Sequence, residues 1–189
     1  MIGVLAVQGA FIEHMQALRA LGVPCVELRQ KSDAEQALTG LILPGGESTV
    51  QGKLLRDLDM YAVLKEKIQR GMPVLGTCAG MILLAQRLSN DDKTHFVTMP
   101  ITVKRNAYGR QLGSFHTQAD FAGLGSVPMT FIRAPYIERI GAGVQTLAEI
   151  DGHIVAARYG KQLALAFHPE LDLDKSMAIH RYFVSLCAE

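Results

Sequence analysis

Short apolar runs alternate with amphipathic segments along the first ninety residues. The apolar runs predict four strands, over 2–7, 24–29, 40–46 and 73–78. The first run, IGVLAV, is unbroken, as is typical of a strand buried on both faces of a sheet. Between the runs, apolar residues at helical spacing predict helices over 11–22, 55–68 and 79–88. This alternation predicts right-handed crossovers and a mostly parallel sheet with helices on both faces.

The pattern changes after Asn90, where strand-like runs follow one another with no room for helices between them. These runs are FVTMPITVKR, GRQLGSF, MTFIRAP, VQTLAEI, HIVAARY and QLALAFH. Asp151-Gly152 between two of them predicts a tight hairpin, so the second half adds antiparallel strands to the sheet. A last helix is predicted over 174–186. The fold class is therefore α/β, with residues 1–189 forming one three-layer domain of a mixed sheet and flanking helices.

Composition narrows the classes of function. The chain has 19 basic and 18 acidic side chains and a formal charge of +1, which gives no reason to expect nucleic acid or a membrane as a partner. Its apolar runs are shorter than the roughly 20 residues that span a bilayer, and its start does not read as a signal peptide. Three cysteines without short spacing predict no disulfide framework and no metal site. We expect a cytoplasmic protein without a cofactor.

The motif GTCAG places Cys78 where the fourth predicted strand meets a helix. A strand that runs directly into a helix makes a sharp, crowded turn, and Gly76 and Gly80 relieve that crowding as in the nucleophile elbow of hydrolases. The N–H of Ala79 would then point toward an oxyanion formed beside the sulfur. The motif alone is also compatible with a small buried cysteine in a tight turn.

A cysteine nucleophile needs a base, and the base needs a group that orients it. The run LALAF leads into His168, Pro169 and Glu170. Because Pro169 favours an extended backbone before it, the side chains of His168 and Glu170 are expected on the same side. We predict that the carboxylate holds the imidazole while the other ring nitrogen faces Cys78.

The segment LILPGGEST supplies a third element. Gly45 and Gly46 follow a strand and let backbone N–H groups approach a reacting carbonyl, so we expect the second oxyanion donor here. Glu47 and Ser48 add a charge and a hydroxyl beside them. The segment is not a phosphate-binding loop, because the chain has no G-x-x-x-x-G-K-[ST] pattern.

These motifs resemble the class I glutamine amidotransferases, and more closely the family of glutaminase subunits of pyridoxal 5′-phosphate synthase. The resemblance covers essentially the whole chain and implies the flavodoxin-like fold of that class. It rests on the order and spacing of AVQGAFIEH, LILPGGEST, GTCAGMILLA, VKRNAYGRQLGSF, FIRAPYI and AFHPEL.

The resemblance also implies roles for single residues. It makes Cys78 the nucleophile, His168 the general base and acid, and Glu170 its orienting partner. It implies that glutamine is contacted by Gly46, Glu47, Ser48, Arg105, Ile132 and Arg133. From the residues alone, nothing selects these two arginines among the basic side chains of the chain.

The implied reaction is hydrolysis of L-glutamine to L-glutamate and ammonia. The implied partner is the synthase subunit, in a large hetero-oligomeric ring assembly to which the ammonia passes. The resemblance places the chain in two reaction classes, hydrolase and lyase. We expect the segment 8–14, beside the site, to form part of the docking face.

Two other interpretations stay open at this point. One is a glutaminase that serves another pathway, such as histidine or tryptophan biosynthesis, although the segments RNAYGRQ and FIRAP argue against it. The other is a flavodoxin-like protein with an elbow cysteine that acts as a redox sensor or a chaperone, a class that needs no late His-Pro-Glu.

Overall fold

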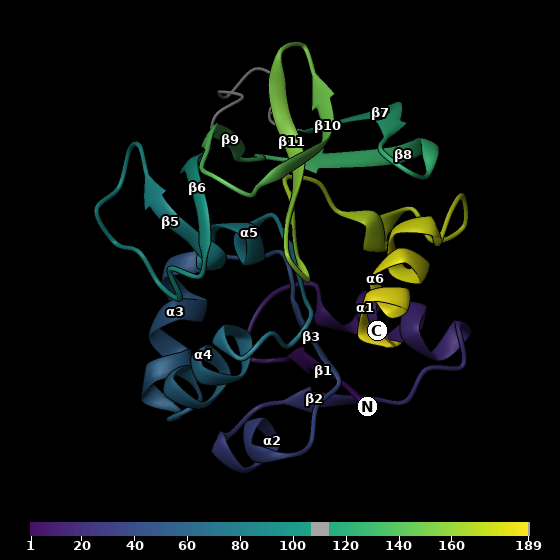
Figure 1. The fold of residues 1–189 in the computed structure, drawn as a ribbon. Helices are drawn as coiled ribbons and strands as arrows, with labels where there is room; N and C mark the ends of the chain where they lie inside the picture. Colours follow the sequence, from purple (N-terminus) through teal and green to yellow (C-terminus); the bar gives the residue numbers. More distant parts are fainter. Residues whose placement is uncertain (107–113, 189) are drawn as a thin grey trace.

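The computed structural model describes residues 1–106 and 114–188 (Figure 1). Among these residues, ten strands form one mixed sheet, with the order β2-β1-β3-β4-β12-β11-β9-β6-β5 and with β10 paired to β11 outside this path. Its strands are β1 (Ile2–Leu5), β2 (Cys25–Leu28), β3 (Gly40–Leu43), β4 (Val74–Thr77), β5 (Ala85–Leu88), β6 (Met99–Lys104), β9 (Tyr136–Ile140), β10 (Gln145–Ile150), β11 (His153–Tyr159) and β12 (Gln162–Leu165). The strands β7 (Ser114–Phe121) and β8 (Gly125–Ile132) form a separate antiparallel pair.

Helices cover both faces of the parallel part of the sheet. They are α1 (Phe11–Ala20), α2 (Lys31–Glu35), α3 (Ser48–Asp57), α4 (Tyr61–Gln69), α5 (Ala79–Leu84) and α6 (Ala178–Ala188), with a 3₁₀ turn, η1 (Pro169–Leu171). Figure 1 shows α3 and α4 on one side of β1 and β3, and α1 and α6 on the other. The predicted α/β class and its three layers are confirmed; that residues 1–189 form a single domain stays a prediction.

The four central strands read as apolar runs because both of their faces are covered. Every residue of β1, β3, β4 and β12 is buried. These strands pair in parallel from β1 through β3 and β4 to β12. Their carboxyl ends therefore meet at one edge of the sheet, where parallel α/β proteins bind their ligands.

Two helix predictions are wrong in their boundaries. The predicted helix over 55–68 is two helices, α3 and α4, because the backbone at Asp59 takes a φ of 55° and breaks the ladder between them. The predicted helix over 79–88 ends at Leu84, because Ala85 turns to an extended conformation and begins β5, which pairs with β6. A single pattern of apolar spacing fits both a long helix and these interrupted elements.

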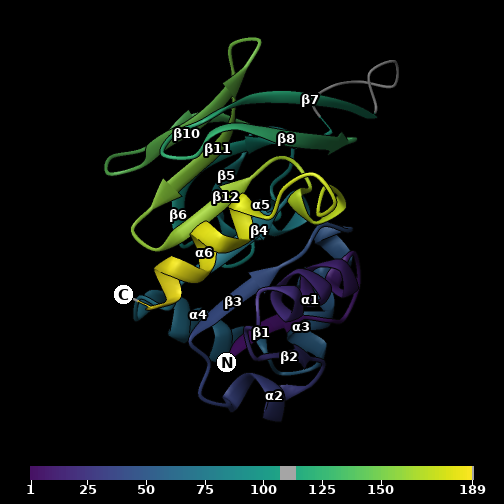
Figure 2. The same cartoon turned by 90° about the vertical axis from the view of Figure 1, so that its right-hand side faces the viewer.

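The second half of the chain adds antiparallel strands to the sheet, as predicted, but some elements and boundaries differ from the prediction. The hairpin at Asp151-Gly152 joins β10 to β11, and both residues have the positive φ that such a turn requires. The sequence pattern did not predict β9, nor that β7 and β8 are separate from the main sheet. Figure 2 shows β7 and β8 at the end of the molecule remote from β2. The last helix begins at Ala178, four residues later than predicted. Most of the run GRQLGSF lies outside the described residues.

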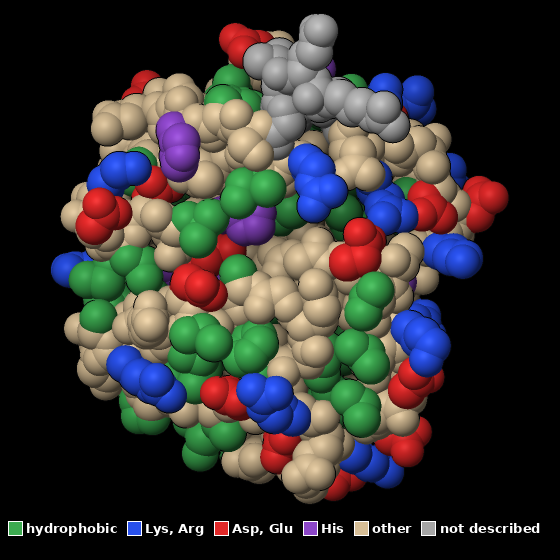
Figure 3. All heavy atoms as spheres, turned by 180° about the vertical axis from the view of Figure 1, so that it is seen from behind, with side chains coloured by type: hydrophobic (Ala, Val, Ile, Leu, Met, Phe, Trp, Pro, Cys, Tyr) green, Lys and Arg blue, Asp and Glu red, His purple; other side chains and the backbone are tan. Residues whose placement is uncertain are grey.

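Two surface properties bear on the choice of partner. None of the helices in the described ranges combines the length and the apolar character needed to cross a membrane. On the face seen in Figure 3, acidic and basic side chains are interspersed, and neither sign gathers into a large patch.

Candidate active site

Cys78 stands at a sharp turn between β4 and α5. Its backbone has a φ of 49° and a ψ of −100°, a conformation that is uncommon for a residue with a side chain. The N–H of Cys78 donates to the carbonyl of Leu165 at 2.8 Å, which continues the pairing of β4 with β12 beyond the end of the strand. The elbow predicted from GTCAG is thus present, and the neighbouring central strand fixes it.

The two elbow glycines are required by close packing. A Cβ on Gly80 would overlap the carbonyl oxygen of Leu43 in β3. A Cβ on Gly76 would lie 2.7 Å from the backbone carbonyl of Gly80. Both obstacles are backbone atoms, so neither can move aside as a flexible side chain could. The glycines therefore let α5 start directly against the sheet.

His168 and Glu170 approach from the far end of the chain. The N–H of His168 donates to the carbonyl of Thr130 at 2.8 Å, which fixes the backbone just before η1. His168 Nδ1 lies 2.7 Å from Glu170 Oε1, and both residues are buried. The two side chains meet, although Glu170 reaches the imidazole from the first turn of η1 and not from the extended segment that the sequence predicted.

The charges of this group are interdependent. Burial disfavours a charged imidazole, but hydrogen bonds to Cys78 and Glu170 and their negative charges outweigh it and raise the pKa of His168 to about 10. Burial also disfavours the Glu170 carboxylate, but His14 and the hydrogen bond and charge of His168 lower its pKa below the ordinary value. At neutral pH the arrangement therefore favours an imidazolium between an anionic carboxylate and the sulfur.

The glycines of the loop after β3 lie against the same group. A Cβ on Gly45 would overlap the imidazole ring of His168, and a Cβ on Gly46 would overlap the side-chain oxygen of Gln8. Gln8 Oε1 accepts from the N–H of Glu47 at 2.8 Å. Glu47 is the N-cap of α3, and its carboxylate accepts from the N–H of Thr49. The loop is thus pressed between the imidazole and the end of β1.

Arg105 is held in place just after β6. Its backbone N–H donates to Asn90 Oδ1 at 3.0 Å, and its carbonyl accepts from Asn90 Nδ2 at 2.9 Å. Its guanidinium contacts Glu47 Oε1 at 3.1 Å and forms a second ion pair with Asp91. Arg133 follows β8 with a φ of 42° and is exposed, as is the neighbouring Ile132.

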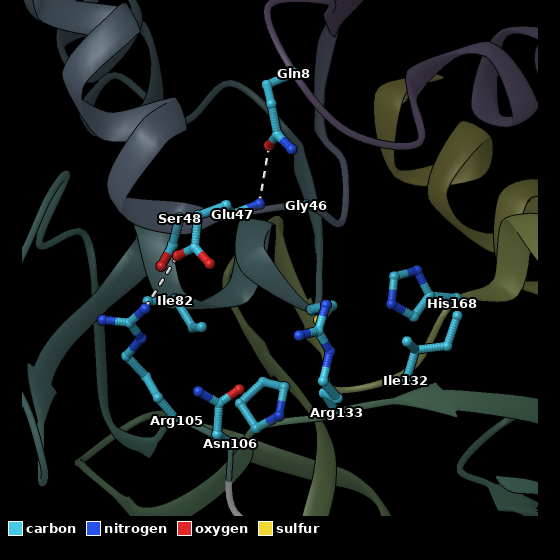
Figure 4. Close-up of a pocket in the computed structure, with 12 residues that line it drawn as sticks. Gln8, Gly46, Glu47, Ser48, Ile82, Arg105, Asn106, Ile132, Arg133 and His168 are labelled. Carbon is cyan, nitrogen blue, oxygen red and sulfur yellow. Dashed lines mark hydrogen bonds and ion pairs between the residues drawn. The ribbon is translucent and has the colours of Figure 1, made fainter. Parts of the chain in front are cut away.

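These parts enclose one cavity of about 300 Å³ (Figure 4). Its lining includes eight residues predicted from the sequence: Gly46, Glu47, Ser48, Cys78, Arg105, Ile132, Arg133 and His168. It also includes four that the predicted site lacked: Gln8, Ile82, Asn106 and Pro135. In Figure 4, Arg133 lies between Arg105 and His168. Glu170, Gly45 and Ala79, also predicted, do not line the cavity but directly adjoin residues that do.

The family model described as SNO glutamine amidotransferase family matches residues 4–189. This chain belongs to the SNO glutamine amidotransferase family. Proteins named pyridoxal 5′-phosphate synthase subunit PdxT are similar to this amidotransferase along almost their whole length. That of Desulfitobacterium hafniense strain Y51 is 62% identical over 97% of this chain and 91% of its own. That of Streptococcus pneumoniae strain ATCC 700669 is 52% identical over 100% of this chain and 98% of its own.

A solved structure supports the same assignment. A chain described as a glutamine amidotransferase superposes on this amidotransferase with a TM-score of 0.93 at 42% identity, and the match covers 100% of this chain and 99% of that one. A chain of the structure described as PurLQS from Thermotoga maritima has a TM-score of 0.66 at 14% identity, covering 97% of this chain and 96% of that one, which shows a shared fold alone.

One sequence-based expectation is wrong. The expectation of two reaction classes included lyase, but the family that matches is described as one of glutamine amidotransferases, so hydrolase is the class that applies. In the described part of the amidotransferase, no group of three or more His, Cys, Asp or Glu side chains is placed to hold a metal ion.

The expected docking segment 8–14 is only partly accessible. Ile12 is 53% exposed, and Gly9 is exposed as well. His14, by contrast, is fully buried beside Glu170. A partner could therefore contact the start of this segment but not its last residue.

Proposed function

We propose that this chain hydrolyses the side-chain amide of L-glutamine and that the ammonia serves pyridoxal 5′-phosphate synthesis. The observation that carries the proposal is the meeting of three groups at one cavity. Cys78 stands at a positive-φ elbow in the cavity wall, His168 lines the same cavity, and Glu170 lies 2.7 Å from the imidazole. A thiol, a hydrogen-bonded base and an orienting carboxylate make a nucleophile capable of acyl transfer.

In the proposed reaction, Cys78 attacks as the thiolate, with its proton on His168. Sγ adds to the amide carbon, and His168 gives its proton to the leaving nitrogen so that ammonia departs and a glutamyl thioester remains. His168 then takes a proton from water, whose oxygen attacks the thioester; glutamate is released, and the thiolate and imidazolium of the starting state are restored. Glu170 keeps the imidazole in the orientation that both steps need.

The oxyanion of each step would be held by the N–H of Ala79 and an N–H of the Gly45-Gly46 loop. The carbonyl of Gly45 accepts from Ala10 at 3.0 Å. Because the peptide is trans, the N–H of Gly46 points to the opposite side from that carbonyl. The N–H of Glu47 is already bonded to Gln8, so Gly46 is the donor this loop can offer without rearrangement.

The cavity suits a single amino acid. Its volume is at the low end of the about 300–1,000 Å³ typical of small-molecule sites. Arg105 and Arg133 offer cations for the substrate carboxylate, and Glu47 offers an acceptor for its ammonium group. Ser48 lines the cavity with a buried hydroxyl that has no hydrogen-bond partner among the described residues, so it is available to glutamine. Gly46 and Ile132 complete the proposed contacts.

The proposed partner is the synthase subunit of pyridoxal 5′-phosphate synthase, in a large hetero-oligomeric ring assembly in the cytoplasm. Relatives at 52–62% identity carry the name of a subunit of that enzyme. Free ammonia would be protonated and lost to water, so a docked glutaminase is chemically sensible.

The test is glutamate release from L-glutamine by the purified chain, both by itself and mixed with the synthase subunit from Desulfitobacterium hafniense, with Cys78→Ala as the control. We expect activity that appears or rises with the synthase and vanishes in the variant. Strong activity without a partner would contradict the dependence on the synthase. No glutamate in either mixture would contradict the glutaminase assignment and favour a sensor or structural thiol.

A further inference from the structure

A chain of buried polar side chains continues behind Glu170, away from the cavity. His14 in α1 and His180 in α6 are both completely buried. His14 Nδ1 lies 2.9 Å from His180 Nε2, and the two rings come from opposite ends of the sequence. His14 Nε2 lies 3.3 Å from Thr77 Oγ1 and 3.4 Å from Glu170 Oε2. His14 therefore stands between the triad and the last helix.

Glu170 has one carboxylate oxygen in need of a donor. Oε1 is bonded to His168 Nδ1. Oε2 is buried and has no hydrogen-bond partner in the described part of the chain. Buried carboxylate oxygens are nearly always satisfied, because an unpaired one is costly. The nearest ring nitrogen, His14 Nε2, lies 3.4 Å away, so a small shift of the carboxylate toward it would supply the missing donor.

Both histidines are neutral, so each ring has only one N–H to donate. Burial lowers the pKa of His14, and the nearby charge of His168 lowers it further. The negative charges of Glu170 and Glu13 act in the opposite direction but do not outweigh burial. Burial and His14 together lower the pKa of His180 to about 3, against the weaker influence of Glu170. Each ring then carries a single N–H at neutral pH.

The unpartnered atoms fix the tautomers. His180 Nδ1 is buried without a hydrogen-bond partner in the described ranges. A buried N–H without a partner is rarer than an unpaired acceptor, so the proton of His180 belongs on Nε2, which donates to His14 Nδ1. The proton of His14 is then on Nε2, where it is hydrogen-bonded to Thr77 Oγ1, and Glu170 Oε2 lies 3.4 Å from the same nitrogen.

We propose that His14 is a positioning residue, whose neutral Nε2–H fixes the plane of the Glu170 carboxylate and so the ring of His168. The proposal rests on the proposed glutaminase function. Because His14 does not line the cavity, its loss acts on the orientation of the base and not on glutamine binding. The effect is expected in kcat with KM unchanged.

Two variants separate this role from simple packing. Asn at position 14 places a polar group where Nδ1 was and keeps an acceptor for His180, but it does not reach Glu170. Gln places its amide N–H near the position of Nε2 and keeps a donor for Glu170, but it loses the contact with His180. With the synthase present, we expect His14→Asn to lower kcat about tenfold, with KM within about twofold, and His14→Gln to stay within about threefold of the wild type. Equal losses in both, or a larger loss in His14→Gln, would overturn the proposal.

Two measurements do not depend on glutamine hydrolysis. In the first, iodoacetamide alkylation of Cys78 is followed against pH by peptide mass, without glutamine. We expect the half-maximal pH to rise in His14→Asn and to stay at the wild-type value in His14→Gln; unchanged profiles in both would overturn the proposal. If the wild type releases no glutamate with the synthase, the proposed function fails, and this comparison still decides the role of His14.

The second measurement uses the unaltered protein, so it does not depend on whether a variant folds. Nitrogen-15 NMR of the histidine rings at neutral pH reports which nitrogen carries the proton. We expect His14 to be neutral with its proton on Nε2. A proton on Nδ1 would leave nothing to donate to Glu170 and would contradict the proposal.

Discussion

Cys78 and Arg133 reach the same cavity from two differently built parts of the molecule. Cys78 follows β4, a strand buried on both faces, and it is 8% exposed. Arg133 follows β8, in the small antiparallel pair, and it is exposed. The proposed nucleophile is thus held by the close-packed sheet, whereas a proposed binding group stands on the rim. Substitutions in the first part should change the rate of the chemical step, and substitutions in the second should change affinity.

The largest expected effect is that of Cys78→Ala. Loss of the nucleophile should lower kcat for glutamine at least about 10³-fold, because no other group can form the thioester. Glutamate release in the presence of the synthase measures it. Cys25→Ser is the matched control, since Cys25 lies in β2 and does not line the cavity, and it should keep wild-type activity. Residual activity close to the wild type would remove Cys78 from the mechanism.

A smaller loss is expected from Glu170→Gln. First, the neutral amide can donate to His168 Nδ1 and so hold the imidazole in the wrong tautomer. Second, loss of the carboxylate charge lowers the pKa of His168. We expect kcat to fall about 10²-fold, less than the about 10⁴-fold loss at the orienting carboxylate of serine proteases, because a thiol ionises more readily than a hydroxyl and needs its base less. Steady-state kinetics and NMR titration of His168 check the two effects separately. Glu149→Gln, at an exposed position of β10, should change neither.

On the rim, Arg133→Ala should raise KM about tenfold and leave kcat nearly unchanged. The reason is loss of a charged hydrogen bond to the substrate carboxylate, which is present in the ground state and the transition state alike. The measurement is the dependence of glutamate release on glutamine concentration. Arg181→Ala, an exposed arginine in α6, is the control. A fall in kcat at constant KM would break the division between the two parts.

The smallest effect concerns stability and pH at His180. Its pKa is lowered from 6.5 to about 3, so its contribution is present above pH 6.5 and is lost progressively as the pH falls toward 3. Between pH 7 and 5.5, this loss should be about 1 kcal/mol of the free energy of unfolding. Urea unfolding at the two values measures it. In His180→Gln the decrease should be smaller by that amount, and an identical decrease would show that His180 does not titrate on unfolding.

Much of the site could be predicted because its signals are local. The elbow is specified by glycines two positions before and after Cys78, and the structure shows that both face backbone atoms. His168 and Glu170 are two residues apart, so their convergence needed only a strand end. Gln8 could have been found by the same logic, since it is a polar residue that closely follows a buried apolar strand.

Other features depend on contacts between distant segments. His14 reads as part of an exposed helix start, and its burial depends on His180, 166 positions away. Arg105 and Arg133 carry no local signal that sets them apart from other basic residues; they were expected only from the resemblance, and their place at the cavity follows from where β6 and β8 end. The strand β5 has no strand-like pattern of its own and forms because β6 lies beside it.

The position of β12 has a consequence for synthesis of the chain. The strand inserts between β4 and β11, although it is made of residues 162–165. While the chain emerges from the ribosome, the edge of β4 that faces β12 therefore stays unpaired until residues 162–165 have been translated, and unpaired edges favour aggregation. The backbone of Cys78 gains its bond to Leu165 at the same late moment. A nascent chain that still lacks residues 162–170 thus carries the Cys78 thiol without the strand and the imidazole that it meets in the folded protein.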